Sequence, residues 1–279
     1  MMLVVAGHDP SYRFIDGRGV GAGVDADKEA AGEFGVSTVN VVTAWTEQEA
    51  GRVTEIGAVN PAIWLSESLR LGYELRHDIS ALKLGLLPGE AAVRTAAKLC
   101  RELRKIMPRL PIVVDPVLAA SGGEEFLDDA GRAALLDDLF PIGVVLTPNR
   151  LEAAALLGCN PDEQPELIAR SLFARGEART APGNSVRGLV LKGGHGKEDP
   201  VRDLIVAPDD ELHAHEHPRK LGASLHGSGC RHASAVAANL ALGLPLVPQQ
   251  AQRHTACHQL APMRAKRNPA HQLPAHHVR

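Results

Sequence analysis

The sequence predicts an α/β protein whose mostly parallel sheet is covered by helices on both faces. Short runs of apolar residues alternate along the chain with stretches in which apolar residues recur at helical spacing. The runs are continuous rather than alternating, as is typical of strands buried on both faces, and strands separated by helices pair in parallel. The 279 residues, 44% of them hydrophobic, are sufficient for one large domain.

Six short apolar runs are the expected strands. Between the third and fourth of them, Val93, Ala97 and Cys100 recur at helical spacing and predict a helix that continues to Met107. Residues 128–139 predict a further amphipathic helix with a cap at its start. The expected strands are residues 3–5, 36–42, 81–84, 112–114, 144–146 and 188–191.

The last third of the chain departs from this alternation. Residues 176–187 form a polar connector, and residues 203–217 predict a hairpin in place of another strand and helix. Small residues predict a helix over 231–242. Beyond Gly243 several prolines interrupt the pattern, so the last dozen residues are expected to be mobile.

Polar and turn residues follow four of the expected strands. In a doubly wound sheet, ligands lie beyond the carboxyl ends of the strands. A binding site is therefore expected where these loops meet. The loops are residues 7–10, 115–117, 147–149 and 192–195.

The composition bears on several classes of function. The four cysteines have no CxxC spacing, which indicates reduced thiols rather than a disulfide or zinc framework. The apolar start, residues 1–6, is too short for a signal peptide, and no run is long enough to span a bilayer. We therefore expect a cytoplasmic protein that has no membrane partner.

The charge distribution favours a small polyanionic ligand. Residues 217–279 contain no Asp or Glu but eight Lys and Arg, which fits a site for a polyanion such as ATP. Aromatic residues make up only 3% of the chain, and the basic residues are scattered. Binding to nucleic acid is therefore not expected.

A turn of small residues, His226 to Cys230, stands just before the expected helix over 231–242. Backbone N–H groups of such a turn converge on an anion, and the helix dipole favours a phosphate there. A thiol in the first turn of a helix has a lowered pKa, so Cys230 is a candidate thiolate that takes a proton from an attacking alcohol. The alternative is a small-residue helix packed closely on the sheet, with Cys230 an ordinary buried residue.

Taken together and in order, eight segments resemble the hydroxymethylpyrimidine/phosphomethylpyrimidine kinases of thiamin biosynthesis. The resemblance implies a ribokinase-like fold: three α/β/α layers, a mostly parallel central sheet and a small hairpin insertion. It implies a single kinase domain over residues 1–245, followed by a divergent segment, 246–279. The matching segments are residues 6–11, 21–27, 42–48, 83–87, 114–117, 147–149, 192–195 and 226–230.

On the substrate side, the resemblance implies a pocket for an aminopyrimidine. The side-chain amide of Gln48 offers a donor and an acceptor that complement the edge of such a ring. Thr46 and Leu86 match pocket-wall positions, and Gly23 allows close approach of the backbone. Asp27 would line the same pocket; its alternative role is an exposed carboxylate in the first turn of a helix.

On the nucleotide side, the resemblance implies binding of ATP with Mg²⁺. Glu152 would orient waters around the magnesium, with Asn149 close by. Asp115 and Lys192 would lie near the phosphates, where Lys192 is followed by Gly193 and Gly194. Two alternatives stay open: Glu152 as a helix N-terminal carboxylate, and Lys192 as a surface lysine.

The implied reaction is direct phosphoryl transfer to the hydroxymethyl group of the pyrimidine. Cys230 would accept or hydrogen-bond the hydroxyl proton, and the backbone N–H groups of Gly227, Ser228, Gly229 and Cys230 would stabilise the developing charge. The family often phosphorylates the monophosphate again in the same pocket, which gives a diphosphate. The family also implies a homodimer.

Several positions depart from the family pattern, among them positions at the mouth of the substrate pocket. Residues 12–20 form an insertion, and His8 replaces a small hydroxyl residue. Glu49 stands in place of Asn, and the pair Leu86 and Leu87 in place of Met and Leu. The tail after Gly243 also differs, in a region that usually covers the adenine.

Three other functions share part of this sequence pattern. A pyridoxal or pyridoxine kinase shares the fold, but Gln48 favours the aminopyrimidine. A non-catalytic pyrimidine sensor would not need Cys230, Glu152 and Lys192 together. A zinc site is suggested only by the alternation of His213, His215 and His217, which lack a fourth ligand and are expected to be surface positions.

Overall fold

The computed structural model describes most of the chain. It covers residues 1–9, 13–15, 18–49, 52–120, 122–177, 188–194, 199–207, 209, 211–219 and 227–247, with the backbone alone at 13–15, 18–20, 48, 49 and 52. His195, His226 and the predicted mobile end of the chain lie outside these ranges.

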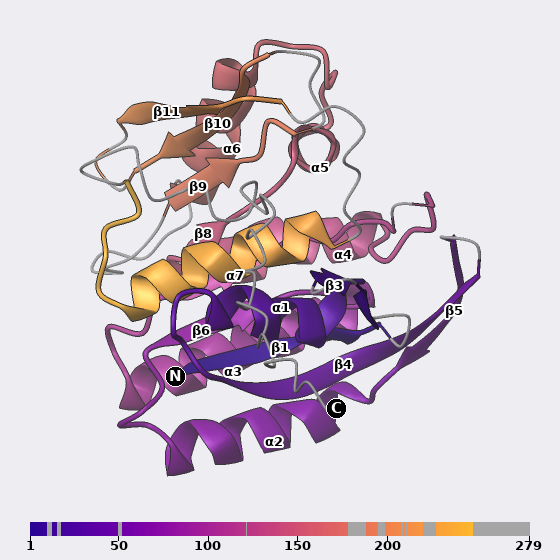
Figure 1. Ribbon diagram of the computed structural model, residues 1–279, viewed down its shortest axis with the longest axis vertical. Coiled ribbons are helices and arrows are strands. Elements are labelled where there is room, and N and C mark those ends of the chain that lie inside the picture. Colours follow the sequence, from indigo (N-terminus) through magenta and orange to yellow (C-terminus); the bar gives the residue numbers. More distant parts are fainter. Residues whose placement is uncertain are drawn as a thin grey trace, which may run out of the picture.

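A nine-stranded sheet forms the centre of the molecule, in the order β11-β10-β9-β8-β7-β6-β1-β4-β5 (Figure 1). Its middle strands are parallel, whereas β5 and the pair β10 and β11 are antiparallel to their neighbours. The strands are β1 (Met2–His8), β4 (Thr38–Glu49), β5 (Arg52–Ala58), β6 (Ala81–Leu84), β7 (Ile112–Val114), β8 (Val145–Leu146), β9 (Gly188–Leu191), β10 (Val201–Val206) and β11 (Leu212–His217).

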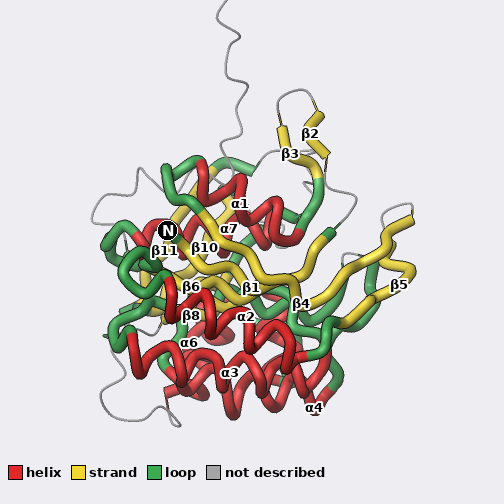
Figure 2. The backbone as a smooth tube through the Cα atoms, turned by 90° about the horizontal axis from the view of Figure 1, so that it is seen from below, coloured by secondary structure: helices red, strands yellow, loops and turns green. Residues whose placement is uncertain are grey.

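Helices cover both faces of this sheet (Figure 2). Along β1, Met2 and Val4 pack in one apolar cluster with α1 and α7, whereas Leu3 and Val5 pack in the other, which contains residues of α2, α3, α4, α5 and α6. The predicted three-layer arrangement is therefore confirmed. The helices are α1 (Gly23–Gly32), α2 (Pro61–Glu74), α3 (Gly89–Ile106), α4 (Asp129–Ala134), α5 (Arg150–Leu157), α6 (Pro165–Glu177) and α7 (Ser228–Ala241).

The predicted strands are found at or close to their expected positions. β6, β7 and β9 have the predicted bounds, whereas β1 and β4 run further toward their carboxyl ends. The predicted hairpin near the end of the chain is confirmed as β10 and β11. Residues 128–139 begin at the predicted cap, where the Asp128 side chain accepts a hydrogen bond from Gly131 N, but the helix changes into a π-helical turn at Leu135–Leu139.

β5 was not predicted, and neither was the far end of β4, with which it pairs in antiparallel fashion. The side chains of Val53 to Ala58 are exposed or only half-buried, so this strand lacks the continuous apolar run that marks the others. A second hairpin, β2 (Arg13–Ile15) and β3 (Arg18–Val20), lies inside the predicted insertion. The β2–β3 hairpin and the paired ends of β4 and β5 extend beyond the layered body (Figure 2).

The expectation that His213, His215 and His217 are surface positions is wrong for two of them. His215 and His217 are 8% and 5% exposed, because they lie on the inward side of β11. No group of three or more His, Cys, Asp or Glu side chains within the described ranges is arranged to hold a metal ion. The structure therefore gives no support to the zinc alternative.

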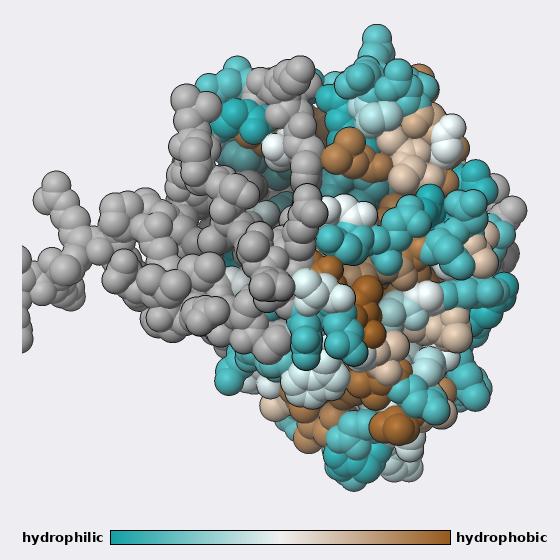
Figure 3. Space-filling view, turned by 90° about the vertical axis from the view of Figure 1, so that its right-hand side faces the viewer, coloured by the Kyte–Doolittle hydropathy of each residue, from teal (hydrophilic) through white to brown (hydrophobic). Residues whose placement is uncertain are grey.

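The described surface is mixed in character. On the face seen in Figure 3, hydrophobic residues lie in small groups between hydrophilic ones. Of the helices that the structure describes, none is long and apolar enough to cross a lipid bilayer.

Candidate active site

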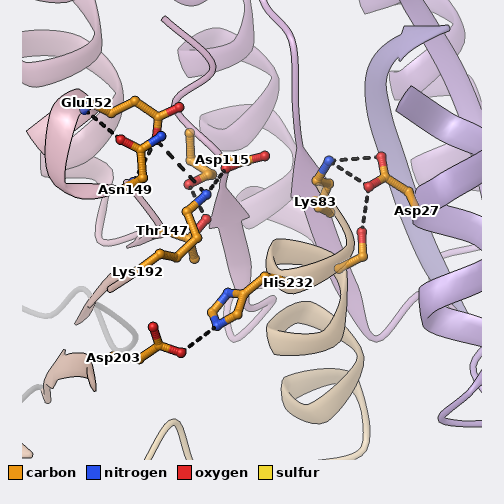
Figure 4. Close-up of polar contacts among 11 residues, drawn as sticks. Asp27, Lys83, Asp115, Thr147, Asn149, Glu152, Lys192, Asp203 and His232 are labelled. Atoms are coloured by element: carbon orange, nitrogen blue, oxygen red, sulfur yellow. Dashed lines mark hydrogen bonds and ion pairs between the residues drawn. The ribbon is translucent and has the colours of Figure 1, made fainter. Parts of the chain in front are cut away.

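Polar side chains from β6, or from the segments that follow β7, β8 and β9, gather near the N-termini of α5 and α7 (Figure 4). The parallel strands all end at the same edge of the sheet, so their following loops become neighbours. Lys192, Asp115, Asn149 and Glu152 form one group. Asp27 and Lys83 form a second, on the other side of α7.

Lys192 is the centre of the first group. Its Nζ donates to Asp115 Oδ1 at 2.9 Å and lies 4.0 Å from Glu152 Oε2. Burial by itself lowers the pKa of Lys192, but the two carboxylates outweigh it and raise the pKa above its usual range. The side chain is therefore a permanent cation, and at 12% exposed it retains access to solvent. The alternative of a surface lysine whose head group reaches into solvent is wrong, because Nζ faces these carboxylates.

Asn149 and Glu152 cap the start of α5. Asn149 Oδ1 accepts from Glu152 N at 2.9 Å, and Glu152 Oε2 accepts from Asn149 N at 2.7 Å. The helix-capping alternative for Glu152 is therefore confirmed, and it also turns the carboxyl group toward Lys192. Burial raises the pKa of Glu152 to about 7, against the opposing effect of Lys192.

The turn of small residues brings the start of α7 to the same place. Gly227 has φ +77°, and a side chain there would overlap the backbone of Gly21. A Cβ added to Gly229 would lie 3.3 Å from Lys192 Nζ and 3.9 Å from Asp115 Oδ2. The first N–H groups of α7, beginning at Ser228, thus lie beside the Lys192 cation. Together they make an anion-binding position.

Cys230 lies in this first turn, but its thiol differs from the prediction. Burial raises the pKa of Cys230 to about 12, and Asp115 and Asp27 act in the same direction, whereas the nearby Lys83 opposes them only in part. The expectation of a lowered pKa is therefore wrong: the desolvation of the sulfur outweighs the helix dipole. At neutral pH, Cys230 is a neutral thiol.

The rate of alkylation of Cys230 is expected to reflect this raised pKa. At pH values below the pKa, the thiolate fraction rises about tenfold with each unit of increasing pH. The rate of labelling by iodoacetamide should therefore still rise steeply between pH 9 and 10. In urea, the labelling rate of the unfolded chain should level off above pH 9, because an ordinary thiol has a pKa of 9.0. Peptide mass spectrometry separates Cys230 from the other cysteines. A labelling rate that reached a plateau between pH 7 and 8 in the folded protein would instead show that Cys230 is a thiolate.

Asp27 lies in the second group and is completely buried. Both of its carboxylate oxygens accept from Lys83 Nζ, at 2.8 and 2.9 Å, and Oδ1 also accepts from the Ser234 hydroxyl at 2.8 Å. The alternative of an exposed first-turn carboxylate is wrong. The carboxylate also does not line an open pocket, because its oxygens point into the protein between α1, β6 and α7.

The predicted substrate side surrounds the turn after β1. Gly23, with φ +72°, packs so closely that a Cβ would lie 2.5 Å from Gly7 O. Thr46 donates to His8 O at 3.3 Å, and Leu86 packs against Gly7. The structure thus brings Gly23, Thr46 and Leu86 together. The side chain of Gln48 lies outside the described part of the chain.

Two aromatic side chains near this turn were not assigned a role from the sequence. The rings of His8 and Trp45 meet edge to face with their centroids 4.6 Å apart, and Trp45 is 51% exposed. His8 Nδ1 also lies 3.4 Å from Asp25 Oδ2. At this end, therefore, an aromatic surface replaces the small hydroxyl residue of the family pattern.

Gly194, the remaining predicted phosphate residue, ends the β9 turn. Its carbonyl accepts from Arg219 Nη1 at 3.2 Å, and a Cβ there would meet no atom of the described chain within 4 Å. Gly194, two positions after Lys192, therefore leaves open space where its side chain would be.

The residues present suit magnesium held through water. Glu152 and Asp115 offer hard oxygen ligands, which Mg²⁺ prefers, but the described residues form no complete protein cage for a metal ion. The remaining ligands would have to be waters and phosphate oxygens.

The sequence analysis assigned no role to four polar residues in or beside these groups: Lys83, Ser234, Asp203 and His232. Of these, only Lys83 left a signal, as a charged residue inside an apolar strand.

The sequence is similar to those of known proteins. The sequence profile described as phosphomethylpyrimidine kinase matches residues 17–256. The hydroxymethylpyrimidine/phosphomethylpyrimidine kinase of Rhizobium meliloti is 32% identical over 229 residues, which are 82% of this chain and 81% of that protein. The thiamine biosynthesis bifunctional protein ThiED of Geobacter sulfurreducens is 33% identical over 88% of this chain, which spans only 46% of that longer protein.

Solved structures agree on the fold. The ADP complex of Bacillus subtilis pyridoxal kinase aligns with a TM-score of 0.72 and 24% identity, over 88% of this chain and 85% of that one. A phosphomethylpyrimidine kinase from Clostridium difficile aligns with a TM-score of 0.65 and 23% identity, over 87% and 90%. The predicted ribokinase-like fold is thereby confirmed.

Proposed function

Because the chain belongs to the phosphomethylpyrimidine kinase family, we propose that it is an ATP-dependent kinase of thiamin biosynthesis. Its acceptor is the hydroxymethyl group of 4-amino-5-hydroxymethyl-2-methylpyrimidine and, in a second step, the phosphate of the resulting monophosphate. One observation supports this most: the Lys192 cation lies beside Gly229 in the first turn of α7, where a phosphoryl group would be transferred.

Lys192, the first turn of α7 and the Cys230 side chain have separate roles in an in-line transfer of the phosphoryl group. The hydroxymethyl oxygen attacks the γ-phosphorus, the bond to the β-γ bridging oxygen breaks, and ADP leaves. Lys192 and the N–H groups from Gly227 to Cys230 neutralise the charge on the moving phosphoryl group. The Cys230 sulfur hydrogen-bonds the hydroxyl, whose proton is released to water after the new P–O bond forms.

When bound, magnesium would neutralise part of the negative charge on the phosphates. Glu152, Asn149 and Asp115 would orient the waters around it. Glu152 is suited to this role because the cap on α5 fixes the direction of its carboxyl group.

ADP release measured with Mg·ATP tests the proposal. Hydroxymethylpyrimidine and its monophosphate should each support turnover, and pyridoxal and a blank without acceptor should not. Pyridoxal kinase is the second candidate, favoured by the alignment with the B. subtilis structure, and turnover with pyridoxal alone would select it. Pyrimidine binding without turnover would select the non-catalytic sensor.

Cys230→Ala is expected to lower kcat about tenfold, the scale of one lost hydrogen bond of about 1.4 kcal/mol that is made in the transition state. KM for both substrates should stay within about twofold, because the substitution removes an interaction made in the transition state. Cys230→Ser is the matched variant: its hydroxyl also accepts a hydrogen bond, so kcat should recover in part. An unchanged kcat in Cys230→Ala would remove this side chain from the mechanism.

The resemblance supports three further proposals about the chain as a whole. Residues 1–245 form one kinase domain, and residues 246–279 diverge from it. The protein acts as a homodimer in the cytoplasm. Sedimentation of the purified protein tests the dimer.

A further inference from the structure

A buried carboxylate outside the groups already described links three segments near the phosphate end of the site. Asp203, on β10, is 5% exposed. Its Oδ1 accepts from Gly193 N at 2.8 Å. Its Oδ2 lies 3.6 Å from His217 Nε2 and 3.6 Å from His232 Nε2. Figure 4 shows the His232 ring pointing from α7 to Asp203.

Each of these three partners belongs to a different element. Gly193 directly follows Lys192, His217 ends β11, and His232 is in α7, one helical turn after Gly229. Residues three apart in a helix share a face, so His232 lies on the side of α7 that faces Lys192. Asp203 therefore connects the lysine-bearing turn with the helix whose N-terminus meets it.

The physical chemistry of this carboxylate indicates a fixed, charged group. Burial raises the pKa of Asp203, but the two imidazoles and the Gly193 N–H outweigh it and hold the pKa well below its usual range. A buried charge is tolerated only when it is paired and hydrogen-bonded, so breaking any arm of this arrangement is costly. Its partners are thereby held in one relative position.

The turn after β9 also needs an external anchor. At Gly193, a Cβ would overlap the backbone of Arg202 on β10, so the turn packs directly against that strand. Lys192 N donates to Pro148 O at 2.8 Å, which ties the other side of the turn to the loop before α5. Asp203 supplies the remaining tie, to α7.

We propose that Asp203 is a positioning residue for nucleotide binding: through Gly193, His217 and His232 it holds Lys192 and the N-terminus of α7 in register, so that both act on the same phosphate. This rests on the proposed kinase function. The pyrimidine end of the site, around Gly23 and Thr46, makes no contact with Asp203 in the described structure. Asp203 should therefore matter for the nucleotide and not for the pyrimidine.

Two substitutions test this. Asp203→Asn leaves an oxygen that accepts from Gly193 N but removes the charge that faces the imidazoles; Asp203→Ala removes both. We expect KM for Mg·ATP to rise on the order of tenfold in Asp203→Asn and up to ~100-fold in Asp203→Ala, the scale of loss from a misplaced catalytic group. The Kd of hydroxymethylpyrimidine, measured by calorimetry without nucleotide, should change less than about twofold.

The control is Glu216→Gln. Glu216 lies on β11 next to His217, and its carboxylate is 55% exposed and paired with Arg202 at 3.3 Å. This variant removes a carboxylate from the same hairpin without touching Asp203, so both constants should match the wild type. His232→Ala removes one arm only, and its effect on KM should be less than additive with that of Asp203→Asn.

The outcomes separate the two proposals. Parallel loss of nucleotide and pyrimidine affinity in Asp203→Asn, in step with a lowered Tm, would make Asp203 a purely structural residue and overturn the inference. Unchanged KM for Mg·ATP would overturn it as well, while wild-type turnover would leave the kinase function standing. A wild-type protein that neither binds nor uses ATP would overturn both.

Discussion

Replacing Lys192 by alanine is expected to lower kcat/KM for Mg·ATP by about 100-fold to 1,000-fold, the range for loss of one preorganised group that stabilises transition-state charge. Lys192 donates a hydrogen bond to the Asp115 carboxylate and lies beside Gly229 at the start of α7. Without it, the buried Asp115 would repel the phosphates, so a repulsion is added to the lost attraction. Steady-state kinetics at varied ATP measure the effect.

Lys105→Ala is the matched control for Lys192→Ala. Lys105 also pairs with a carboxylate, Glu102 at 2.7 Å, but it is 68% exposed on α3, away from the site. Its kinetics should match the wild type. A folded Lys192→Ala protein with kcat/KM within threefold of the wild type would contradict the phosphate role of Lys192.

The second large effect is on stability. Lys83→Met is expected to lower the free energy of unfolding by about 3–5 kcal/mol, because it leaves the Asp27 carboxylate buried without its cation. The pair is fully buried, with both Asp27 oxygens within 2.9 Å of Lys83 Nζ. Urea unfolding followed by circular dichroism measures the change.

The double variant Lys83→Met with Asp27→Asn separates charge from shape. It removes both charges and should recover at least half of the lost stability. If the double variant were no more stable than Lys83→Met, the cost would come from packing. Arg70→Met on α2 is the surface control: Arg70 pairs with Glu67 at 2.7 Å, both half-exposed, and its loss should leave the unfolding midpoint unchanged.

Much of the fold could be predicted because its central strands are short, apolar and buried on both faces. β7 and β9 carry that pattern over their whole lengths, and β6 carries it apart from Lys83. β5 does not, since it is held by backbone pairing with β4 beyond the core rather than by apolar burial. Strands that protrude from the layers therefore leave little periodic signal in the sequence.

The site could be predicted where a motif and a strand end coincide, as at Lys192 and Glu152. It could not be predicted where burial, or contact between segments distant in the sequence, determines the chemistry. The first-turn position of Cys230 indicates a low pKa, but the surrounding protein desolvates the sulfur and reverses the sign. Asp203 and His232 are 29 positions apart and carry no shared motif, so only the packing of α7 on β10 brings them together.

The order of the strands has a consequence for how the chain reaches this structure. In the middle of the sheet, Met2 pairs with Thr38 on one side and with Ala81 on the other, so partners are far apart along the chain. The hairpin of β10 and β11 joins neighbours instead. Hairpins form in about 1–10 μs, whereas distant partners must first meet the entropic cost of closing a long loop. The rate-limiting event in folding should therefore be the assembly of the parallel centre.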